Sequence, residues 1–418
     1  MTQICRALRG FIALGLLLWL NACGLLGLGE ELQKLNQDIM IGGQVTGELR
    51  AGAPIYVVVQ DQRAGDTLHS YTSVKAGAPE QSYFFMLPPG EYRILAFQDN
   101  DGDLRRSKGE PVGEVLDGNP LQLSDVSQEQ YELNIVLRRQ APRPLLLDLS
   151  TASLAKRRPN TPASLGAIVS LDDPSFSDEA AELGLWQPRQ FMDQVVGGLF
   201  FLERYRSSKK PVLFIHGALG HPGNWRGAIK SLDRNHYQPW LYYYPTAASL
   251  EDVSVYLAWF IYELQAQLGF ERLTLVAHSM GGLVALRAAQ LLEEYQGNTS
   301  PIDRLITLST PWQGHKGAAM GARLAPAAAP SWLDVSPGSD FLRDLAQRGL
   351  PAGVRHMLLF SYRGSSSLGD KADGAVSLTS QLAPEYQIGA ERVIGFDETH
   401  RTILSGDRPL QTLQMLLR

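Results

Sequence analysis

The chain of 418 residues is short of cysteine and carries no strong excess of positive charge. Its two cysteines, Cys5 and Cys23, lie near the amino end, and no other residue is a cysteine. This excludes a disulfide framework and a thiol nucleophile in the body of the protein. The net charge is −5, and the sequence has no long basic stripe, C-x-x-C spacing or phosphate-binding G-x-x-x-x-G-K-[ST] loop. We therefore expect no nucleic-acid partner.

The amino end also lacks an apolar run long enough to cross a bilayer. The run from Phe11 to Leu20 has ten residues, whereas a spanning helix needs about 20. Arg6 and Arg9 precede it, and a positive segment before a short apolar run is typical of a signal peptide. We expect residues 1–22 to be such a peptide.

The apolar run ends in Leu20-Asn21-Ala22-Cys23, which resembles the lipobox of bacterial lipoproteins. The resemblance implies that Cys23 becomes the acylated first residue of the mature chain, anchored to a membrane by about 0.8 kcal/mol per buried CH₂ group. The next residue is Gly24, whereas an Asp there often retains such lipoproteins in the inner membrane. The resemblance thus favours the outer membrane of a bacterial envelope. The alternative is a plain secretory signal with an incidental cysteine.

The composition, 44% hydrophobic and 19% charged, is that of an ordinary globular protein with two to three units. Residues 23–40 have no strong period and are predicted to be a tether. About seven short strands separated by turns, such as Pro88-Pro89-Gly90, predict a small all-β sandwich over residues 41–140. Residues 141–165 form a Pro-rich, basic linker. The sequence does not identify a protein partner for the sandwich.

Residues 166–418 have a different pattern. Apolar strand candidates such as "PVLFIHG" and "RLITLST" alternate with helical segments such as "SLEDVSVYLAWFIYELQAQLGF". This alternation predicts an α/β domain with a mostly parallel sheet covered by helices on both faces.

The stretch "VAHSMGG" places Ser279 between a strand and a helix, with Ala277 and Gly281 two positions away on either side. It resembles the G-x-S-x-G nucleophile elbow of α/β-hydrolases, with Ala277 in place of the first glycine. Such a serine lies in a strained turn, where bulky side chains at these two positions would collide with neighbouring backbone. We therefore predict that Ser279 is a nucleophile.

A serine nucleophile needs a base and an orienting acid, which follow it in the order acid, histidine in this fold. His400 follows the last strand candidate, "ERVIGF", and is the predicted base. Asp373 is the predicted acid, because "DGAV" resembles the D-G-x-V run of many lipases. Asp370 is an alternative in the same loop, whereas Asp397 is too close to His400 in sequence.

The oxyanion of the reaction needs two backbone N–H groups. One is predicted at Met280, the residue after the nucleophile. The other is predicted at Ala218, after the strand "PVLFIHG", because His216-Gly217 matches the His-Gly of lipases. Leu219 is the alternative.

Roughly residues 205–418 thus resemble the α/β-hydrolase lipases and esterases in five ordered pieces: "FIHGALG", "VAHSMGG", "LSTPWQG", "KADGAVSL" and "DETHRTIL". The resemblance implies a Ser-His-Asp acyl-enzyme mechanism that requires no metal or cofactor, acting on a lipid or other acyl ester. An acyltransferase, thioesterase or amidase would use the same residues. The rival class is a non-catalytic binding lipoprotein.

Two further segments suggest ligand sites. Residues 312–350 are rich in Ala, Leu and Pro and are predicted to form a cap, whose large apolar side chains either line an acyl pocket or pack the cap onto the body: Met320, Leu324, Trp332, Leu333 and Phe341. The run "DNDGDLRRSKGE" carries acidic residues at positions 1, 3, 5 and 12 of a calcium loop, Asp99, Asp101, Asp103 and Glu110. Leu104 stands where an EF-hand has glycine, so the alternative is a solvated turn.

Overall fold

The computed structural model describes residues 27–33, 37, 39–47, 49–50, 53–63, 65, 67–74, 81–124, 132–139, 147–149, 165–195, 197–297, 300–365 and 371–418. The predicted signal peptide, Cys23 and Asp370 lie outside these residues. In the described part of the chain, no helix combines the length and the apolar character needed to cross a membrane.

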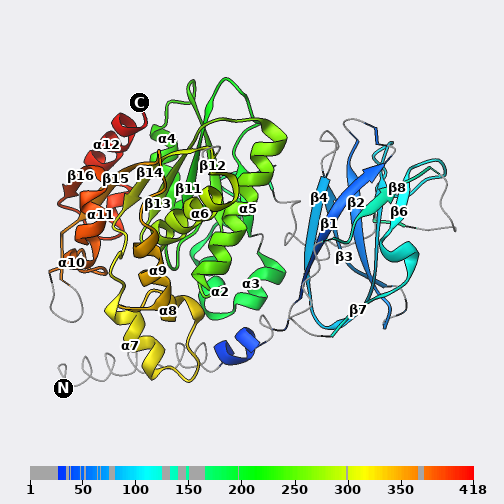
Figure 1. Cartoon of the computed structure of the whole chain (residues 1–418), viewed down its shortest axis with the longest axis horizontal. Helices are drawn as coiled ribbons and strands as arrows, with labels where there is room; N and C mark the ends of the chain where they lie inside the picture. The colour runs from blue at the N-terminus through cyan, green and yellow to red at the C-terminus, as the bar shows by residue number, and fades with distance from the viewer. Residues whose placement is uncertain are drawn as a thin grey trace, which may run out of the picture.

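The amino-terminal part is a β-sandwich, shown at the right of Figure 1. One sheet has the order β4-β1-β8 and the other the order β3-β2-β5-β6, with β7 also paired to β5. Side chains that alternate along the strands, such as Ile39 and Ile41 of β1, form the core between the sheets. The strands are β1 (Ile39–Gly47), β2 (Ile55–Asp61), β3 (Thr67–Val74), β4 (Gln81–Leu87), β5 (Gly90–Gln98), β6 (Val112–Glu114), β7 (Leu121–Leu123) and β8 (Ile135–Leu137).

The carboxyl-terminal part contains an eight-stranded sheet with the order β16-β15-β14-β13-β11-β12-β10-β9. The six strands from β16 to β12 in this order are parallel, and β10 pairs antiparallel with β12. The predicted fold class, a mostly parallel sheet preceded by a small all-β sandwich, is confirmed. The strands are β9 (Ala167–Ile168), β10 (Gly198–Phe201), β11 (Lys210–Ile215), β12 (Tyr237–Tyr243), β13 (Leu273–His278), β14 (Ile302–Leu308), β15 (Arg355–Ser361) and β16 (Ala390–Phe396).

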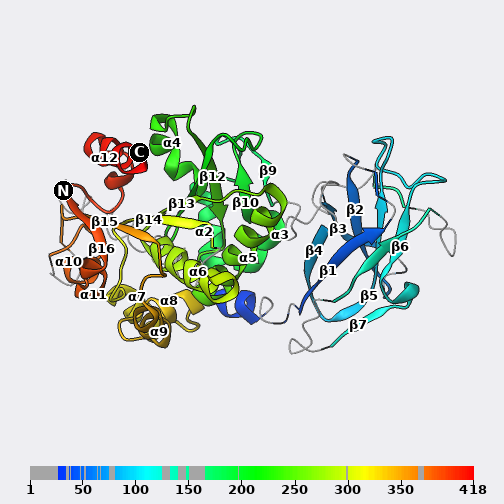
Figure 2. The same cartoon turned by 45° about the horizontal axis from the view of Figure 1, so that its top comes forward.

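Helices cover both faces of this sheet, as Figures 1 and 2 show. In β11, Leu213 and Ile215 join a core with α5 and α6, whereas Val212 and Phe214 join a core with α4 and α12. This alternation explains why the strand reads as a continuous apolar run. The helices are α2 (Asp178–Trp186), α3 (Pro188–Gln194), α4 (Arg226–Ser231), α5 (Leu250–Leu268), α6 (Met280–Gln296), α10 (Leu378–Gln381), α11 (Pro384–Ile388) and α12 (Asp407–Leu417), and the 3-10 helices are η1 (Val115–Gly118), η4 (Pro222–Trp225) and η6 (Thr402–Leu404).

The predicted cap segment forms three helices between β14 and β15, namely α7 (Lys316–Leu324), α8 (Pro330–Asp334) and α9 (Asp340–Arg348). Its large apolar side chains divide into two groups. Trp332 and Phe341 pack against buried clusters, whereas Met320, Leu324 and Leu333 are 47%, 77% and 54% exposed. Packing of the cap onto the body therefore does not account for these three.

Part of the predicted tether is structured. Residues 27–33 form a short helix, blue in Figure 1, that lies against the carboxyl-terminal part rather than the sandwich in both views. Leu28 and Leu32 are buried in a cluster with Leu185, Ala247 and Ala329. Leu147 and Leu149, within the predicted linker, pack on the sandwich instead. The absence of a strong sequence period hid both segments because each buries only two side chains.

Candidate active site

Ser279 lies at the carboxyl end of β13, in the turn that starts α6. Its φ of 54° and ψ of −130° are a strained conformation for a residue with a side chain. A Cβ on Gly281 would lie 2.3 Å from the His216 carbonyl oxygen, and one on Gly282 would lie 2.0 Å from Thr310 Oγ1. The small residues after Ser279 are therefore a steric requirement of the turn, as the sequence indicates.

The structure brings Ser279, His400 and Asp373 together from three separate loops. Ser279 Oγ lies 2.9 Å from His400 Nε2, and His400 Nδ1 lies 2.7 Å from Asp373 Oδ2. The His400 backbone N–H also donates to the Asp373 carbonyl at 2.8 Å. The two nitrogens of one imidazole thus connect the hydroxyl to the carboxylate, the arrangement in which a histidine can remove a serine proton.

Asp373 is fully buried, and its carboxylate accepts four hydrogen bonds. Oδ1 accepts the backbone N–H groups of Ala375 and Val376, and Oδ2 accepts Ser361 Oγ–H at 2.8 Å besides His400. Burial raises the pKa of Asp373, but the hydrogen bonds and charge of its partners outweigh burial and hold the pKa below its usual value. The carboxylate is therefore ionised at neutral pH.

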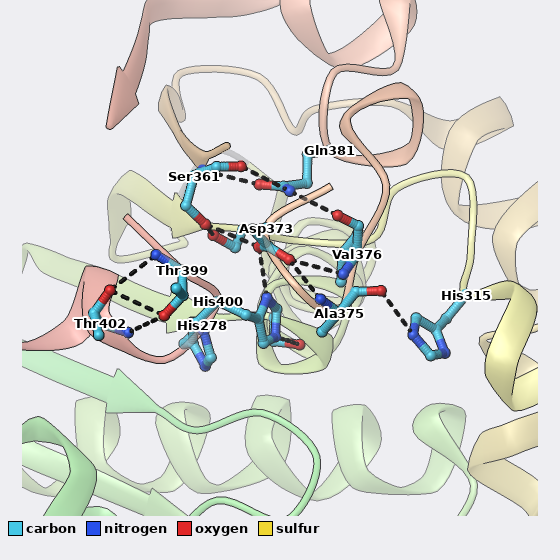
Figure 3. A network of polar contacts seen from close by, with 12 residues as sticks. His278, His315, Ser361, Asp373, Ala375, Val376, Gln381, Thr399, His400 and Thr402 are labelled. Atoms are coloured by element: carbon cyan, nitrogen blue, oxygen red, sulfur yellow. Dashed lines mark hydrogen bonds and ion pairs between the residues drawn. The ribbon is translucent and has the colours of Figure 1, made fainter. Parts of the chain in front are cut away.

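Ser361, at the end of β15, contacts the candidate acid and was not predicted from the sequence. Figure 3 shows its hydrogen bonds to Asp373 and to Gln381. Gln381 Nε2 donates to the carbonyls of Ser361 and Val376, both at 3.1 Å, which joins the strand end to the acid loop. Because β15 and the acid loop meet through residues far apart in sequence, only the position of Ser361 at a strand end could have indicated this role.

The loop of His400 is held by paired threonines. Thr399 and Thr402 exchange backbone-to-hydroxyl hydrogen bonds of 2.9 and 3.2 Å. His278 Nε2–H donates to the His400 carbonyl at 2.8 Å. Burial lowers the pKa of His278 to about 3 and that of His216 also to about 3, so both rings are neutral at ordinary pH. Their hydrogen bonds position backbone around the site.

His315 connects the cap to the acid loop. Its Nδ1 accepts the Ala318 N–H at 3.0 Å and so caps α7, which leaves Nε2–H to donate to the Ala375 carbonyl at 3.1 Å. Trp312 belongs to the "LSTPWQG" piece at the base of the cap. It is buried and stacks on Tyr386 with ring centres 4.1 Å apart, so it packs the cap base rather than facing the nucleophile.

The two predicted oxyanion donors lie in the expected loops. Met280 is the first residue of α6, and Ala218 follows β11. Gly217 approaches so closely that a Cβ there would lie 2.7 Å from Ser279 Cβ. Leu219 N–H, the alternative donor, lies 3.5 Å from Thr246 Oγ1, a long hydrogen bond. This partner favours Ala218 over Leu219.

The predicted calcium loop lies apart from Ser279, after β5 of the sandwich. Carboxylate oxygens of Asp99, Asp101 and Asp103 lie within 4.8 Å of one another. Glu110 is not part of this group, and its two oxygens accept the N–H groups of Asn100 and Ser107 at 2.5 and 2.7 Å. Both carboxylate oxygens of Asp99 likewise accept backbone N–H groups, from Gly102 and Leu104. Of the four predicted ligands, three thus come together, and Glu110 closes the loop instead.

Asp397, which the sequence analysis set aside as the acid, forms an exposed ion pair with Arg363 at 3.1 Å. Its carboxylate therefore belongs to the surface.

The residues that carry the five ordered pieces all meet at the carboxyl edge of the parallel sheet, where ligands bind in open α/β sheets.

Comparisons with known proteins agree with this fold. The α/β hydrolase fold family matches residues 210–362, and no curated protein matches the chain. Similar solved structures include a Bacillus licheniformis lipase, BlEst2, at 19% identity and TM-score 0.42, covering 53% of this chain and 98% of that one. Aspergillus fumigatus lipase B has 18% identity and TM-score 0.37, covering 49% and 52%.

Legionella pneumophila phospholipase PlaB has 17% identity and TM-score 0.33, covering 41% of this chain and 45% of that one. With TM-scores below 0.5, these likenesses establish neither the fold nor a function. From the family match and the parallel eight-stranded sheet, we conclude that the carboxyl-terminal part of this chain has the α/β-hydrolase fold.

Proposed function

We propose that the protein is a membrane-anchored serine hydrolase that cleaves carboxylic esters of lipids or other acyl groups. The observation that supports it is the hydrogen-bonded series from Ser279 Oγ through His400 to Asp373, at 2.9 and 2.7 Å. An alcohol, an imidazole and a buried carboxylate in this order are the parts of an acyl-transfer site.

In the first half-reaction, His400 Nε2 takes the proton of Ser279 Oγ as the oxygen bonds to the ester carbonyl carbon. The carbonyl electron pair moves onto the oxygen, whose charge the N–H groups of Met280 and Ala218 stabilise. When the carbonyl re-forms, His400 gives its proton to the departing alkoxide. An alcohol leaves, and the acyl group stays on Ser279.

In the second half-reaction, His400 takes a proton from water, whose oxygen attacks the acyl carbon. Collapse returns the proton to Ser279 Oγ and releases a carboxylic acid. Asp373 keeps its charge throughout and stabilises the imidazolium that forms in each half-reaction. The four hydrogen bonds to its carboxylate support this role.

The proposed anchor is an acylated Cys23 in a bacterial outer membrane, with residues 1–22 removed. This part rests on the Leu20-Asn21-Ala22-Cys23 sequence. Cys23→Ser should release the protein from the membrane fraction, and the mass of the purified wild-type chain should exceed that of residues 23–418 by its acyl groups. A wild-type mass without acyl groups would contradict the anchor.

A fluorophosphonate probe tests the nucleophile. We expect it to label the wild-type protein on Ser279, and Ser279→Ala to fold normally while kcat on a short acyl ester falls about 10⁴-fold or more. Ser405→Ala, which changes an exposed serine near the His400 loop, is the matched control and should keep full activity. A Ser279→Ala variant with most of its activity would refute the assignment.

The same probe separates an enzyme from a non-catalytic binding lipoprotein, which would not react. A substrate panel then separates the alternatives that share these residues: lipid esters, short esters, thioesters, amides, and esters with an added alcohol acceptor. Turnover of short soluble esters alone, with none on lipid dispersions, would refute the lipid substrate class.

A further inference from the structure

Helix α7 exposes its large side chains and turns its small ones toward the protein. None of its residues is buried. The residues on its outer face, at helical spacing, are Lys316, Met320, Arg323 and Leu324, all exposed. Glycine and alanine fill the inner side, where a Cβ on Gly321 would lie 3.5 Å from the Trp332 ring. A surface helix of a globular protein has the opposite arrangement, with its large apolar side chains toward the core and its polar side chains toward water.

The next helix of the cap, α8, also exposes a large apolar side chain, because Leu333, which follows Trp332, is 54% exposed. We call Met320, Leu324 and Leu333, with the neighbouring Arg323, the α7 face. Large apolar side chains flanked by basic ones are the composition of helices that lie in a membrane interface, apolar groups inward and cations at the headgroups.

The α7 face lies beside the candidate active site. His315 caps the start of α7 and donates to the loop of Asp373. On the other side, Leu219 and Trp332 pack against the same buried cluster as the helix at residues 27–33. The loop that carries Ala218 and Leu219, the cap and this short helix therefore share one edge of the protein.

The helix at residues 27–33 is the described segment nearest in sequence to Cys23. Leu28 and Leu32 are buried, and Gln190 N–H donates to Glu31 at 3.1 Å. A Cβ on Gly29 would lie 3.3 Å from Ala327 Cβ, in the cap between α7 and α8. Five residues of chain span at most about 18 Å, so an anchor at Cys23 stays close to the α7 face.

We propose that the α7 face lies on the lipid bilayer that holds Cys23, and that the helix at residues 27–33 fixes this orientation. The proposal rests on the proposed membrane anchor and adds the face that meets the membrane. A short connection beside the cap turns the edge that carries the cap and the loops of Ala218 and Asp373 toward the lipid surface. Acyl esters of that surface then reach Ser279 without crossing water.

A single fluorescent label tests the orientation. The chain has two cysteines, one in the predicted signal peptide and one at the acylation site, so Leu324→Cys supplies the one reactive thiol of the mature protein. The full-length protein is purified from membranes and reconstituted into phosphatidylethanolamine–phosphatidylglycerol vesicles that contain a spin-labelled phospholipid. Met415→Cys, at a side chain 57% exposed on α12, is the matched control.

We expect the label at 324 to be quenched at least about three times as strongly as the label at 415. The reason is that an interfacial apolar face is buried roughly 5–10 Å into the boundary between headgroups and acyl chains. Leu333→Cys should behave like Leu324→Cys. Equal quenching at 324 and 415 would overturn the proposal. Absence of quenching at 324, with disulfide-linked dimers through Leu324→Cys, would also overturn it and assign the face to a second copy of the chain.

The role of the short helix is tested in the same assay. In the Leu324→Cys background, Leu28→Ser with Leu32→Ser removes its buried contacts, and quenching should fall toward the value at 415. Glu30→Ser with Gln33→Ser changes exposed residues of the same helix and should leave quenching unchanged. Equal quenching in the two double variants would overturn the role of the helix.

Fluorophosphonate labelling and short-ester turnover, measured on the same vesicles, report the proposed activity separately. Normal turnover with equal quenching at 324 and 415 refutes the orientation alone. Strong quenching at 324 without turnover supports the orientation and refutes the proposed activity. Protein that does not remain with the vesicles refutes the anchor and, with it, this proposal.

Discussion

Replacing Ser361 with alanine tests whether the buried carboxylate of Asp373 depends on its outer hydrogen bonds. Ser361 Oγ–H donates to Asp373 Oδ2 at 2.8 Å. Ser309 Oγ lies 2.6 Å from Ser361 Oγ. Because the Ser361 proton is already used, Ser309 Oγ–H donates to Ser361 Oγ. The substitution removes one of four donors from a fully buried anion. A hydrogen bond to a charged group contributes about 1.5–3 kcal/mol, and we expect a loss of that size at pH 8.

The pH dependence identifies the cause. The pKa of folded Asp373 is held below the usual 3.8, so the stability from its ionised contacts is present above pH 3.8 and is lost as the pH falls through the lower, folded value. Below that value Ser361 donates to a neutral carboxyl group, and its contribution falls to about 0.5–1.5 kcal/mol. The difference between wild type and Ser361→Ala should therefore shrink at low pH.

Urea unfolding at pH 8, at pH 5 and at lower pH values down to about 2 measures this difference, and turnover of a short ester at pH 8 measures the effect on the site. We expect kcat to fall about tenfold, equivalent to roughly 1.4 kcal/mol, because the carboxylate keeps three of its hydrogen bonds. Ser309→Ala is the matched control, since it leaves the bond from Ser361 to Asp373 intact, and should cost less. An unfolding penalty for Ser361→Ala that stays the same from pH 8 down to about pH 2 would refute the reasoning.

Three other perturbations follow from the structure. Gly281→Ala places a Cβ 2.3 Å from the His216 carbonyl and should cost about 1–3 kcal/mol or more in thermal unfolding, with loss of turnover. Gly321→Ala, with its nearest contact at 3.5 Å, is the helical control and should stabilise by up to about 1 kcal/mol; equal effects would contradict the steric argument. Burial lowers the pKa of His216 and His278 from 6.5 to about 3. Below pH 6.5 the unfolded chain therefore binds more protons than the folded chain. Each ring should lower the free energy of unfolding by about 1.4 kcal/mol for each pH unit below 6.5. Unfolding at pH 7, 6 and 5 checks this slope, which a flat profile would contradict. Calcium at Asp99, Asp101 and Asp103 should bind weakly, with Kd near 10⁻⁴–10⁻³ M, and Asp101→Asn with Asp103→Asn should abolish it; calorimetry without heat at millimolar calcium would refute the site.

The three residues of the candidate site could be picked out from the sequence because each lies in a short motif with a local physical cause. Ser279 is marked by the small residues that its turn requires, and His400 by its position after the last strand. Ser361 gives no such local indication. Its role depends on the packing of β15 against the loop of Asp373, and such packing between distant segments has no period or motif in the sequence.

Two details of the cap and the tether could not be predicted for a related reason. The apolar side chains of the cap were expected to line an acyl pocket or to pack onto the body, whereas Met320, Leu324 and Leu333 are exposed, because glycine and alanine fill the contact with the body. The helix at residues 27–33 buries two leucines, too few to give a hydrophobic period. In both cases, whether a side chain is buried depends on a surface that another part of the chain supplies.

The place of the short helix has a consequence for the architecture of the chain. The polypeptide begins its described course on the hydrolase fold, passes through the sandwich, and returns to the hydrolase fold at residue 165. In sequence, the sandwich therefore lies between two segments that pack on the hydrolase fold. A protein cut at the linker would lose Leu28 and Leu32 and expose the apolar surface of Leu185, Ala247 and Ala329. Deleting the sandwich cleanly means joining the short helix to residue 165.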